Sequence, residues 1–177
     1  MRLKDKIALV TGSSRGVGRA VALGFAKEGA KLVVNYTSNE KAANEVVEAV
    51  GSMGSKAVAV KADVAQKSDA ENLVATAIDT FGRLDILVNN AGFTRPALMI
   101  KMTEEQWDQV VDIHLKGAFL CSQAAANKMK EQNSGKIINV MSVAGLVGTV
   151  GQINYSAAKG GILSMTKSIA RELARYN

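Results

Sequence analysis

The stretch IALVTGSSRGVG, residues 7–18, decides the fold. An apolar run, Ile7–Thr11, leads straight into a loop whose glycines follow the spacing Gly-x-x-x-Gly-x-Gly, and the helical pattern Gly16–Lys27 comes next. Glycines at such a place let the backbone turn sharply and approach a pyrophosphate, while the N-terminus of the next helix offers unpaired N–H groups. We interpret the stretch as a phosphate-binding loop. A plain turn between a strand and a helix is the alternative.

The same strand-then-helix unit recurs along the chain. Short runs rich in Val and Ile predict strands, and the first four are nearly continuous, as strands covered on both faces should be. The predicted strands are Ile7–Thr11, Leu32–Tyr36, Ala57–Lys61, Ile86–Asn89 and Ile137–Met141. The predicted helices are Gly16–Lys27, Asn39–Met53, Asp69–Phe81, Thr103–Lys130 and Tyr155–Arg175. This alternation predicts an α/β fold: a Rossmann-like, doubly wound parallel sheet with helices on both faces. No linker or low-complexity tract interrupts it, so residues 1–177 are expected to form a single domain.

Helix ends carry their own signals. Two pairs have the spacing of a capping box, Ser68 with Glu71 and Thr103 with Gln106. Three glycines fall where helices should stop, Gly29, Gly54 and Gly82.

Composition narrows the class of protein. Of the 177 residues, 47% are hydrophobic and 21% charged, with a net charge of +6, which is ordinary for a globular protein. The positive residues are scattered among acidic ones and no zinc-ligand spacing occurs, so we expect neither a nucleic-acid partner nor a metal. There is no membrane-length apolar run and no secretory signal. The one cysteine, Cys121, suits a cytoplasmic protein and is expected to be a small buried hydrophobe.

The end of the second predicted strand bears on cofactor preference. An NAD site usually has an Asp or Glu there for the adenosine ribose, but this strand ends Asn35-Tyr36-Thr37-Ser38. Arg15 in the glycine loop could meet a 2′-phosphate, helped by the hydroxyls of Thr37 or Ser38, and Asn35 would not repel it. The sequence therefore favours NADP(H) over NAD(H). A solvated loop cation is the alternative for Arg15.

Tyr155 and Lys159 open the last predicted helix with a spacing of four, which puts both side chains on one helix face. An ammonium beside a phenol stabilises the phenolate and makes the tyrosine a usable acid or base near neutral pH. Ser142 follows the fifth predicted strand, at the edge where ligands bind in such sheets. These three residues are the candidate catalytic group.

Taken together, the glycine loop, the segment Asn89-Asn90-Ala91-Gly92 and the Tyr-x-x-x-Lys pair resemble the short-chain dehydrogenase/reductase family, over the whole chain from its first strand. Within it, bacterial 3-oxoacyl-acyl-carrier-protein reductases of fatty acid synthesis are the most similar in segments 89–95, 115–119 and 151–161. The resemblance implies that Tyr155 donates a proton to a carbonyl oxygen as hydride arrives from the nicotinamide. Lys159 would hold the nicotinamide ribose, and Ser142 would orient the carbonyl.

The resemblance also implies a cofactor-binding set: Gly12, Ser14, Arg15, Gly16, Val17, Gly18, Asn35, Asp63, Val64, Asn90, Ala91 and Gly92, together with Tyr155 and Lys159. From the chain alone, Asp63 is equally well a helix cap or a turn residue. Asn89 and Asn90 equally well tie neighbouring strands together.

The chain departs from the family pattern in three places. His114 stands where the family usually completes its catalytic set with Asn, and we expect it to take that place because the main-chain carbonyl is kept. A packed helix histidine is the alternative. Met141 replaces a small polar residue before Ser142. Relatives continue beyond the Tyr-Lys helix, so we expect a fold truncated after that helix, with an exposed fifth strand.

The leading functional hypothesis is an NADP(H)-dependent reductase of 3-oxoacyl thioesters, with an acidic acyl carrier protein as a candidate partner. Alternatives are a short-chain alcohol, sugar or steroid dehydrogenase, or a noncatalytic dinucleotide-binding fragment. The resemblance also implies a homotetramer or homodimer built on the last two long helices. Core or interface candidates there are Trp107, Phe119 and Met165.

Overall fold

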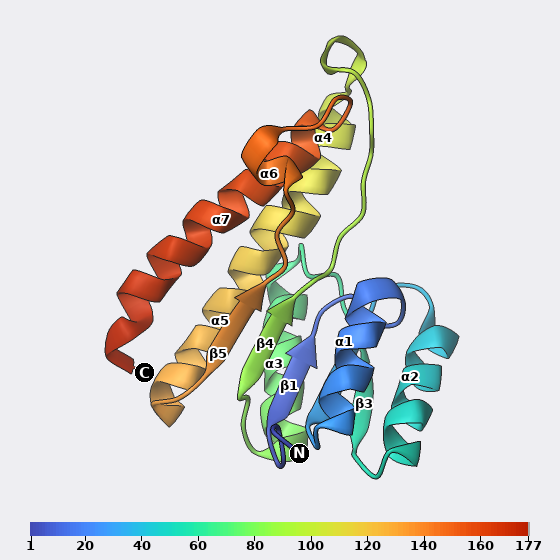
Figure 1. Cartoon of the computed structure of the whole chain (residues 1–177), viewed down its shortest axis with the longest axis vertical. Coiled ribbons are helices and arrows are strands. Elements are labelled where there is room, and N and C mark those ends of the chain that lie inside the picture. Colours follow the sequence, from blue (N-terminus) through green and yellow to red (C-terminus); the bar gives the residue numbers. More distant parts are fainter. Residues whose placement is uncertain (177) are drawn as a thin grey trace.

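A computed structural model describes residues 1–176 of the chain as a parallel sheet with helices on both faces (Figure 1). The strands are β1 (Ile7–Val10), β2 (Lys31–Tyr36), β3 (Ala57–Lys61), β4 (Ile86–Asn89) and β5 (Lys136–Asn139). The α-helices are α1 (Gly16–Lys27), α2 (Glu40–Ser52), α3 (Lys67–Phe81), α4 (Glu104–Val111), α5 (Gly117–Gln132), α6 (Ala144–Val147) and α7 (Ile153–Leu173). Shorter turns of helix are η1 (Met99–Lys101), η2 (Asp112–Lys116) and η3 (Ala174–Tyr176). The predicted fold class is confirmed.

The strands lie in the order β3-β2-β1-β4-β5, and each neighbouring pair is parallel. The chain winds outward from β1 to β3 and then returns to the other side of β1 with β4. The order therefore reverses between β1 and β4, where the connections leaving the two strands diverge and open a crevice at their carboxyl ends. In this region Leu9 of β1 pairs with Val33 of β2 and Leu87 of β4.

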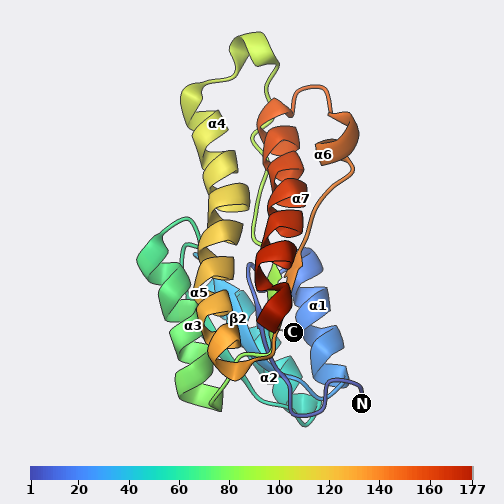
Figure 2. The ribbon, with the colours of Figure 1, turned by 90° about the vertical axis from the view of Figure 1, so that its left-hand side faces the viewer.

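Alternate side chains of each strand serve two separate cores. Leu9 and Val33 point into one core, with α3 and α5, whereas Ala8 and Val10 point into the other, with α1 and α2. Because both faces are covered, all four residues of β1 are buried. This explains why the central strands are continuously apolar rather than alternating. Figure 2 shows α3, α5 and α7 on one side of the sheet and α1 on the other.

Most of the predicted boundaries agree with the structure to within two residues, and Gly29, Gly54 and Gly82 all take positive φ where helices end. The capping box at Thr103 and Gln106 is confirmed. The one predicted at Ser68 is wrong, because α3 already begins at Lys67 and Gln66 precedes it without a side-chain cap. Asp69 of that first turn instead accepts a hydrogen bond from the Asp63 N–H at 2.8 Å.

The predicted helix Thr103–Lys130 is interrupted by a π turn, η2, between α4 and α5. The residues at the two ends of this turn keep helical backbone angles, so the axis continues, but the extra residue rotates the faces. His114 in this turn is consequently only 5% exposed. Two short elements were not predicted, η1 and α6. A lone parallel bridge between Ala97 and Gln152 joins the loops that carry them. No helix within residues 1–176 has both the length and the apolar character needed to cross a membrane.

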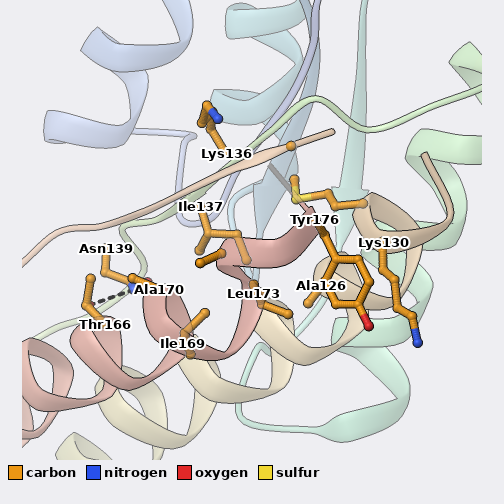
Figure 3. Close-up of a pocket in the computed structure, with 13 residues that line it drawn as sticks. Ala126, Lys130, Lys136, Ile137, Asn139, Thr166, Ile169, Ala170, Leu173 and Tyr176 are labelled. Carbon is orange, nitrogen blue, oxygen red and sulfur yellow. Dashed lines mark hydrogen bonds between the residues drawn. The ribbon is translucent and has the colours of Figure 1, made fainter. Parts of the chain in front are cut away.

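β5 forms one edge of the sheet and is less covered than the central strands, as predicted. Ile138 is 46% exposed on one face. On the other face of β5, a groove of about 270 Å³ lies between α5, β5 and α7 (Figure 3). Asn139 donates to the Thr166 hydroxyl there at 2.9 Å. The groove is lined mostly by aliphatic side chains, and Tyr155 and Lys159 do not line it.

Candidate active site

A hollow of about 530 Å³ opens at the carboxyl ends of the central strands, where the strand order reverses. The glycine loop forms one wall and the segment after β4 forms another. Apart from Tyr155 and Lys159, twelve residues were predicted to bind the cofactor. Eleven of them line this hollow, and Gly18 does not. The lining residues are Gly12, Ser14, Arg15, Gly16, Val17, Asn35, Tyr36, Thr37, Ala62, Asp63, Val64, Asn90, Ala91, Gly92, Phe93 and Ile113.

The glycine loop is shaped by two close approaches. Gly12 has φ +61°, and a Cβ on it would lie 2.9 Å from the Ala91 Cα. A Cβ on Gly18 would lie 2.5 Å from the Gly12 carbonyl oxygen and equally close to the Asn90 side chain. Only glycine fits both places, so the loop and the start of α1 pack directly against the segment after β4.

The N-terminus of α1 is free to meet an anion. Arg15, its N-cap residue, makes no side-chain cap, and the first turn holds no acidic residue. The first N–H groups of a helix lack partners within the helix and carry the positive end of its dipole. Because these groups open on the hollow, the site has the donors and the room that a dinucleotide diphosphate requires.

Thr11 and the two asparagines at the end of β4, Asn89 and Asn90, tie the neighbouring segments together. The Thr11 hydroxyl accepts from the N–H groups of Asn90 at 2.9 Å and Ala91 at 3.0 Å. The Asn90 amide donates to the Thr11 carbonyl at 2.9 Å. The Asn89 amide donates to Asn139 of β5 at 2.8 Å. Asn89 therefore joins two neighbouring strands, whereas Asn90 joins the glycine loop and also lines the hollow.

The residues expected around the adenosine differ in how they face solvent. Arg15, Thr37 and Asp63 are exposed, and Val64 is buried. The Asp63 carboxylate accepts from the Ala65 N–H at 3.0 Å, so it closes a local turn. Asn35 is only 1% exposed, and its side chain is directed inward to the protein backbone rather than outward to solvent.

Tyr155 and Lys159 lie one turn apart at the start of α7, and the Lys159 Nζ is 5.7 Å from the centre of the Tyr155 ring. Lys159 is 4% exposed and donates to the Val140 carbonyl oxygen. Burial lowers the pKa of its ammonium to about 8, because a charged group loses solvation there. Tyr155 is partly exposed, so its phenol can reach a ligand while the lysine stays behind it.

His114 joins this group from η2. Its ring meets the Tyr155 ring edge-on, with centroids 5.1 Å apart. Its Nε2 lies 2.8 Å from the Phe93 carbonyl oxygen. Since a carbonyl only accepts, we assign the proton to Nε2, which leaves Nδ1 as an acceptor. Burial, and next the charge of Lys159, lower the pKa of His114 to about 4, so the ring is neutral near pH 7.

Gly92 makes room for His114. A Cβ on this glycine would overlap the imidazole ring. His114 also lines a small cavity of about 10 Å³ together with Asn89 and Lys159. The structure thus brings His114 close to Lys159 and Tyr155.

Ser142 lies beyond the end of β5, two residues after Val140, and is partly exposed. Its hydroxyl accepts from the Ala144 N–H at 3.2 Å and can still donate to a ligand. Met141 beside it is 37% exposed. Cys121, by contrast, is fully buried, and burial raises the pKa of its thiol to about 12, which agrees with the predicted packing role.

Asn154 is a positioning residue that the sequence did not single out. Its side chain is fully buried and donates to the carbonyls of Arg95 at 3.1 Å and Gln106 at 2.9 Å. Its Oδ1 accepts from the Tyr155 N–H at 2.8 Å. Asn154 thereby fixes the first turn of α7, with Tyr155, against α4 and the loop after β4. Its position directly before Tyr155 was the only available signal.

The chain is similar in sequence to known proteins of one family. The sequence model of the family described as short chain dehydrogenase matches residues 6–177. A 3-oxoacyl-acyl-carrier-protein reductase of Synechocystis sp. is 49% identical over 172 residues, which are 97% of this chain and 70% of that protein. The 3-oxoacyl-acyl-carrier-protein reductase FabG of Staphylococcus aureus is 48% identical over 169 residues, 96% of this chain and 69% of that protein.

Solved structures give the same result. The crystal structure of a short chain dehydrogenase from Mycobacterium avium is 42% identical and superposes with a TM-score of 0.95. The match covers 99% of this chain and 65% of that one. The chain therefore spans about two thirds of the length of these relatives.

Proposed function

Because the chain belongs to the short-chain dehydrogenase family, we propose that it is an NADP(H)-dependent oxidoreductase that reduces a carbonyl to an alcohol, with a 3-oxoacyl thioester as substrate. The observation that carries the proposal is the buried Lys159 behind a partly exposed Tyr155, at the end of the sheet where the glycine loop opens. Residues 1–177 would act as one dinucleotide-binding domain.

Each residue of the site has a chemical task in this proposal. Tyr155 gives its phenolic proton to the carbonyl oxygen while hydride is added to the carbonyl carbon, so that a C–H and an O–H bond form together. The Lys159 ammonium stabilises the phenolate that remains. The Ser142 hydroxyl donates a hydrogen bond that orients the carbonyl. His114, neutral and held by Phe93, keeps Tyr155 in place from its ring edge.

The dinucleotide would be held by the residues that line the hollow. The N–H groups at the start of α1 would bind its diphosphate, the segment from Asn90 to Gly92 would contact it, and Asp63 and Val64 would flank its adenine. When bound, it supplies the hydride. The exposed Arg15 and Thr37, with no carboxylate at the end of β2, favour a 2′-phosphate and therefore NADP(H).

The substrate proposal rests on similarity to proteins that are themselves named 3-oxoacyl-acyl-carrier-protein reductases. An alcohol, sugar or steroid substrate would use the same Ser142, Tyr155 and Lys159, so the distinction lies in the substrate and not in the chemistry. The net charge of +6 supports an acidic acyl carrier protein as partner.

Assembly and location are also proposals. Trp107 on α4 and Phe119 on α5 are 37% and 45% exposed, which suits an interface of a homodimer or homotetramer on these helices. Met165 of α7 is the third candidate for this interface. We place the protein in the cytoplasm. Sedimentation at micromolar concentration tests the assembly, and a monomer alone would contradict it.

The direct test follows NADPH consumption by the purified chain with an acetoacetyl thioester and, in parallel, with simple ketones, sugars and steroids. We expect consumption with the thioester, formation of the 3-hydroxy product and strongly reduced turnover by Tyr155→Phe. Turnover of only the other carbonyl compounds would contradict the substrate. No turnover of any, with NADPH still bound, would favour a noncatalytic dinucleotide-binding domain.

A further inference from the structure

Asn35, near the end of β2, connects two parts of the cofactor site through its buried amide. The residue is 1% exposed, yet it carries a polar side chain in a strand whose neighbours are apolar. A buried amide costs free energy unless its donors and acceptor are paired. Both ends of the Asn35 amide are paired here, the oxygen as an acceptor and the nitrogen as a donor.

On one side Asn35 holds the first turn of the glycine loop. The Gly12 N–H donates to the Asn35 Oδ1 at 2.9 Å, and the Ser13 N–H donates to the Asn35 carbonyl at 2.9 Å. The Ser13 hydroxyl donates back to the Val10 carbonyl at 2.7 Å and accepts from the Asn35 N–H at 3.1 Å. The loop is therefore fixed to β2 by side-chain and main-chain bonds together.

On the other side the Asn35 Nδ2 reaches the end of β3. It donates to the Ala62 carbonyl at 3.0 Å, and the carbonyls of Val60 and Tyr36 lie at 3.4 Å and 3.3 Å. Ala62 directly precedes Asp63 and Val64. A carboxylate at position 35 would face these carbonyls with lone pairs, and an aliphatic side chain would leave the Gly12 N–H without an acceptor. Among side chains of this shape, an amide alone serves both partners.

One consequence concerns the diphosphate. Because the Gly12 N–H is already bonded to Asn35, it is not available to a ligand, and Gly12 contributes shape rather than a donor. The donors left for an anion are those farther along, at the start of α1.

We infer that Asn35 is a positioning residue, which fixes the glycine loop relative to the end of β3 for a dinucleotide and does not itself choose between NADP(H) and NAD(H). The inference rests on the proposed function for its ligand. It changes the expectation from the sequence, in which Asn35 favoured NADP(H) simply by carrying no charge.

The test compares NADPH and NADH affinities of the full chain and its variants, well below the melting temperature of each. Asn35→Leu, which is neutral and of similar shape, should weaken both affinities by the same factor, about three- to tenfold, the effect of one well-placed hydrogen bond. Asn35→Asp should also weaken NADPH binding and bring no gain for NADH. Asn72→Asp, the same change on the exposed face of α3, should alter neither affinity. Thr37→Asp, exposed at the hollow, should shift the ratio toward NADH.

Tighter NADH binding by Asn35→Asp would overturn the inference, because it would mean direct contact with the ribose. So would unchanged affinities in a folded Asn35→Leu chain. If both variants fail to fold, hydrogen exchange of the Gly12 amide in the unmodified chain decides. We expect this amide to be protected with and without NADPH, and rapid exchange without NADPH would contradict its bond to Asn35. If the unmodified chain binds neither dinucleotide, the proposed function fails, whereas the exchange result still tests the Asn35 bond.

Discussion

The two halves of the site differ in how completely their polar groups are paired. On the cofactor side, Thr11, Asn35 and Asn90 use their side chains for bonds to the neighbouring loops. On the catalytic side, three buried side-chain atoms have no partner within residues 1–176: Asn89 Oδ1, His114 Nδ1 and Ser156 Oγ. Burying an unpaired polar atom costs about 1–3 kcal/mol.

This difference assigns separate tasks to the two halves. The cofactor side is complete as a frame before a ligand arrives, which lowers the cost of ordering on binding. The catalytic side keeps unpaired hydrogen-bonding atoms near Tyr155 and Lys159, each at a cost in stability. If so, substitutions should separate chemistry from cofactor binding on the catalytic side and should couple binding to stability on the cofactor side.

The largest separation is expected for Tyr155→Phe. The variant loses the proton donor and keeps the ring against His114, so turnover of the thioester should fall by about two to four powers of ten while the NADPH dissociation constant hardly changes. Lys159→Ala should damage both, because the ammonium serves the phenol and a bound ribose. Steady-state rates and fluorescence titrations measure the two effects. Retained turnover in Tyr155→Phe would show that the assigned mechanism is wrong.

Acid should destabilise the catalytic side through His114. The pKa of this ring is about 4 in the folded chain, against 6.5 ordinarily, so between these values the unfolded state binds the additional proton. Stability is therefore full above pH 6.5 and falls as the pH drops toward 4, by at most about 3 kcal/mol. Urea unfolding at several pH values measures it. His114→Asn should lack this part of the slope, and an unchanged slope would point to other groups.

On the cofactor side, Gly12→Ala should weaken NADPH binding and stability together. Alanine disfavours φ +61°, and its Cβ would press on the Ala91 backbone, so we expect a loss of about 2 kcal/mol in the free energy of unfolding. Gly24→Ala is the matched control, since its Cβ would meet nothing within 4 Å in α1 and should if anything stabilise that helix. Equal behaviour of the two variants would remove the special role of Gly12.

The smallest effect is expected at the start of α4. Thr103→Ala removes the hydroxyl that accepts from the Gln106 N–H at 3.2 Å and should cost about 1 kcal/mol. The Gln106 carbonyl also accepts a hydrogen bond from the Asn154 side chain. The variant therefore tests whether a weaker start of α4 affects the catalytic side. We expect a lower melting temperature with an unchanged NADPH dissociation constant. A change in cofactor affinity would show that the two halves are coupled.

The sequence predicted the fold, and most of the residues that line the hollow, because local signals were strong. The apolar run before Gly12 and the spacing of Tyr155 and Lys159 each depend on neighbours in the chain. It did not predict the direction of the Asn35 side chain, because that depends on the carbonyls of Val60 in β3 and of Ala62 just after β3. The π turn around His114 left no pattern of its own, since the helical periodicity continues on either side of it.

The error at Ser68 has a similar cause. The spacing with Glu71 fits a capping box, but Asp69 binds the Asp63 N–H and the helix begins earlier. A contact with the preceding turn thus outweighed a local motif. Asn154 was missed for the same reason, because its partners Arg95 and Gln106 come from distant loops and helices.

In the proposed function the two halves of the site act in one reaction, with hydride from the dinucleotide and a proton from Tyr155. The most direct measurement uses NADPH carrying deuterium at the transferred position of its nicotinamide, with an acetoacetyl thioester and the purified chain. We expect deuterium on the alcohol carbon of the 3-hydroxy product, and almost no product from the Tyr155→Phe variant. A product without deuterium, or equal labelling by the Tyr155→Phe variant, would contradict it.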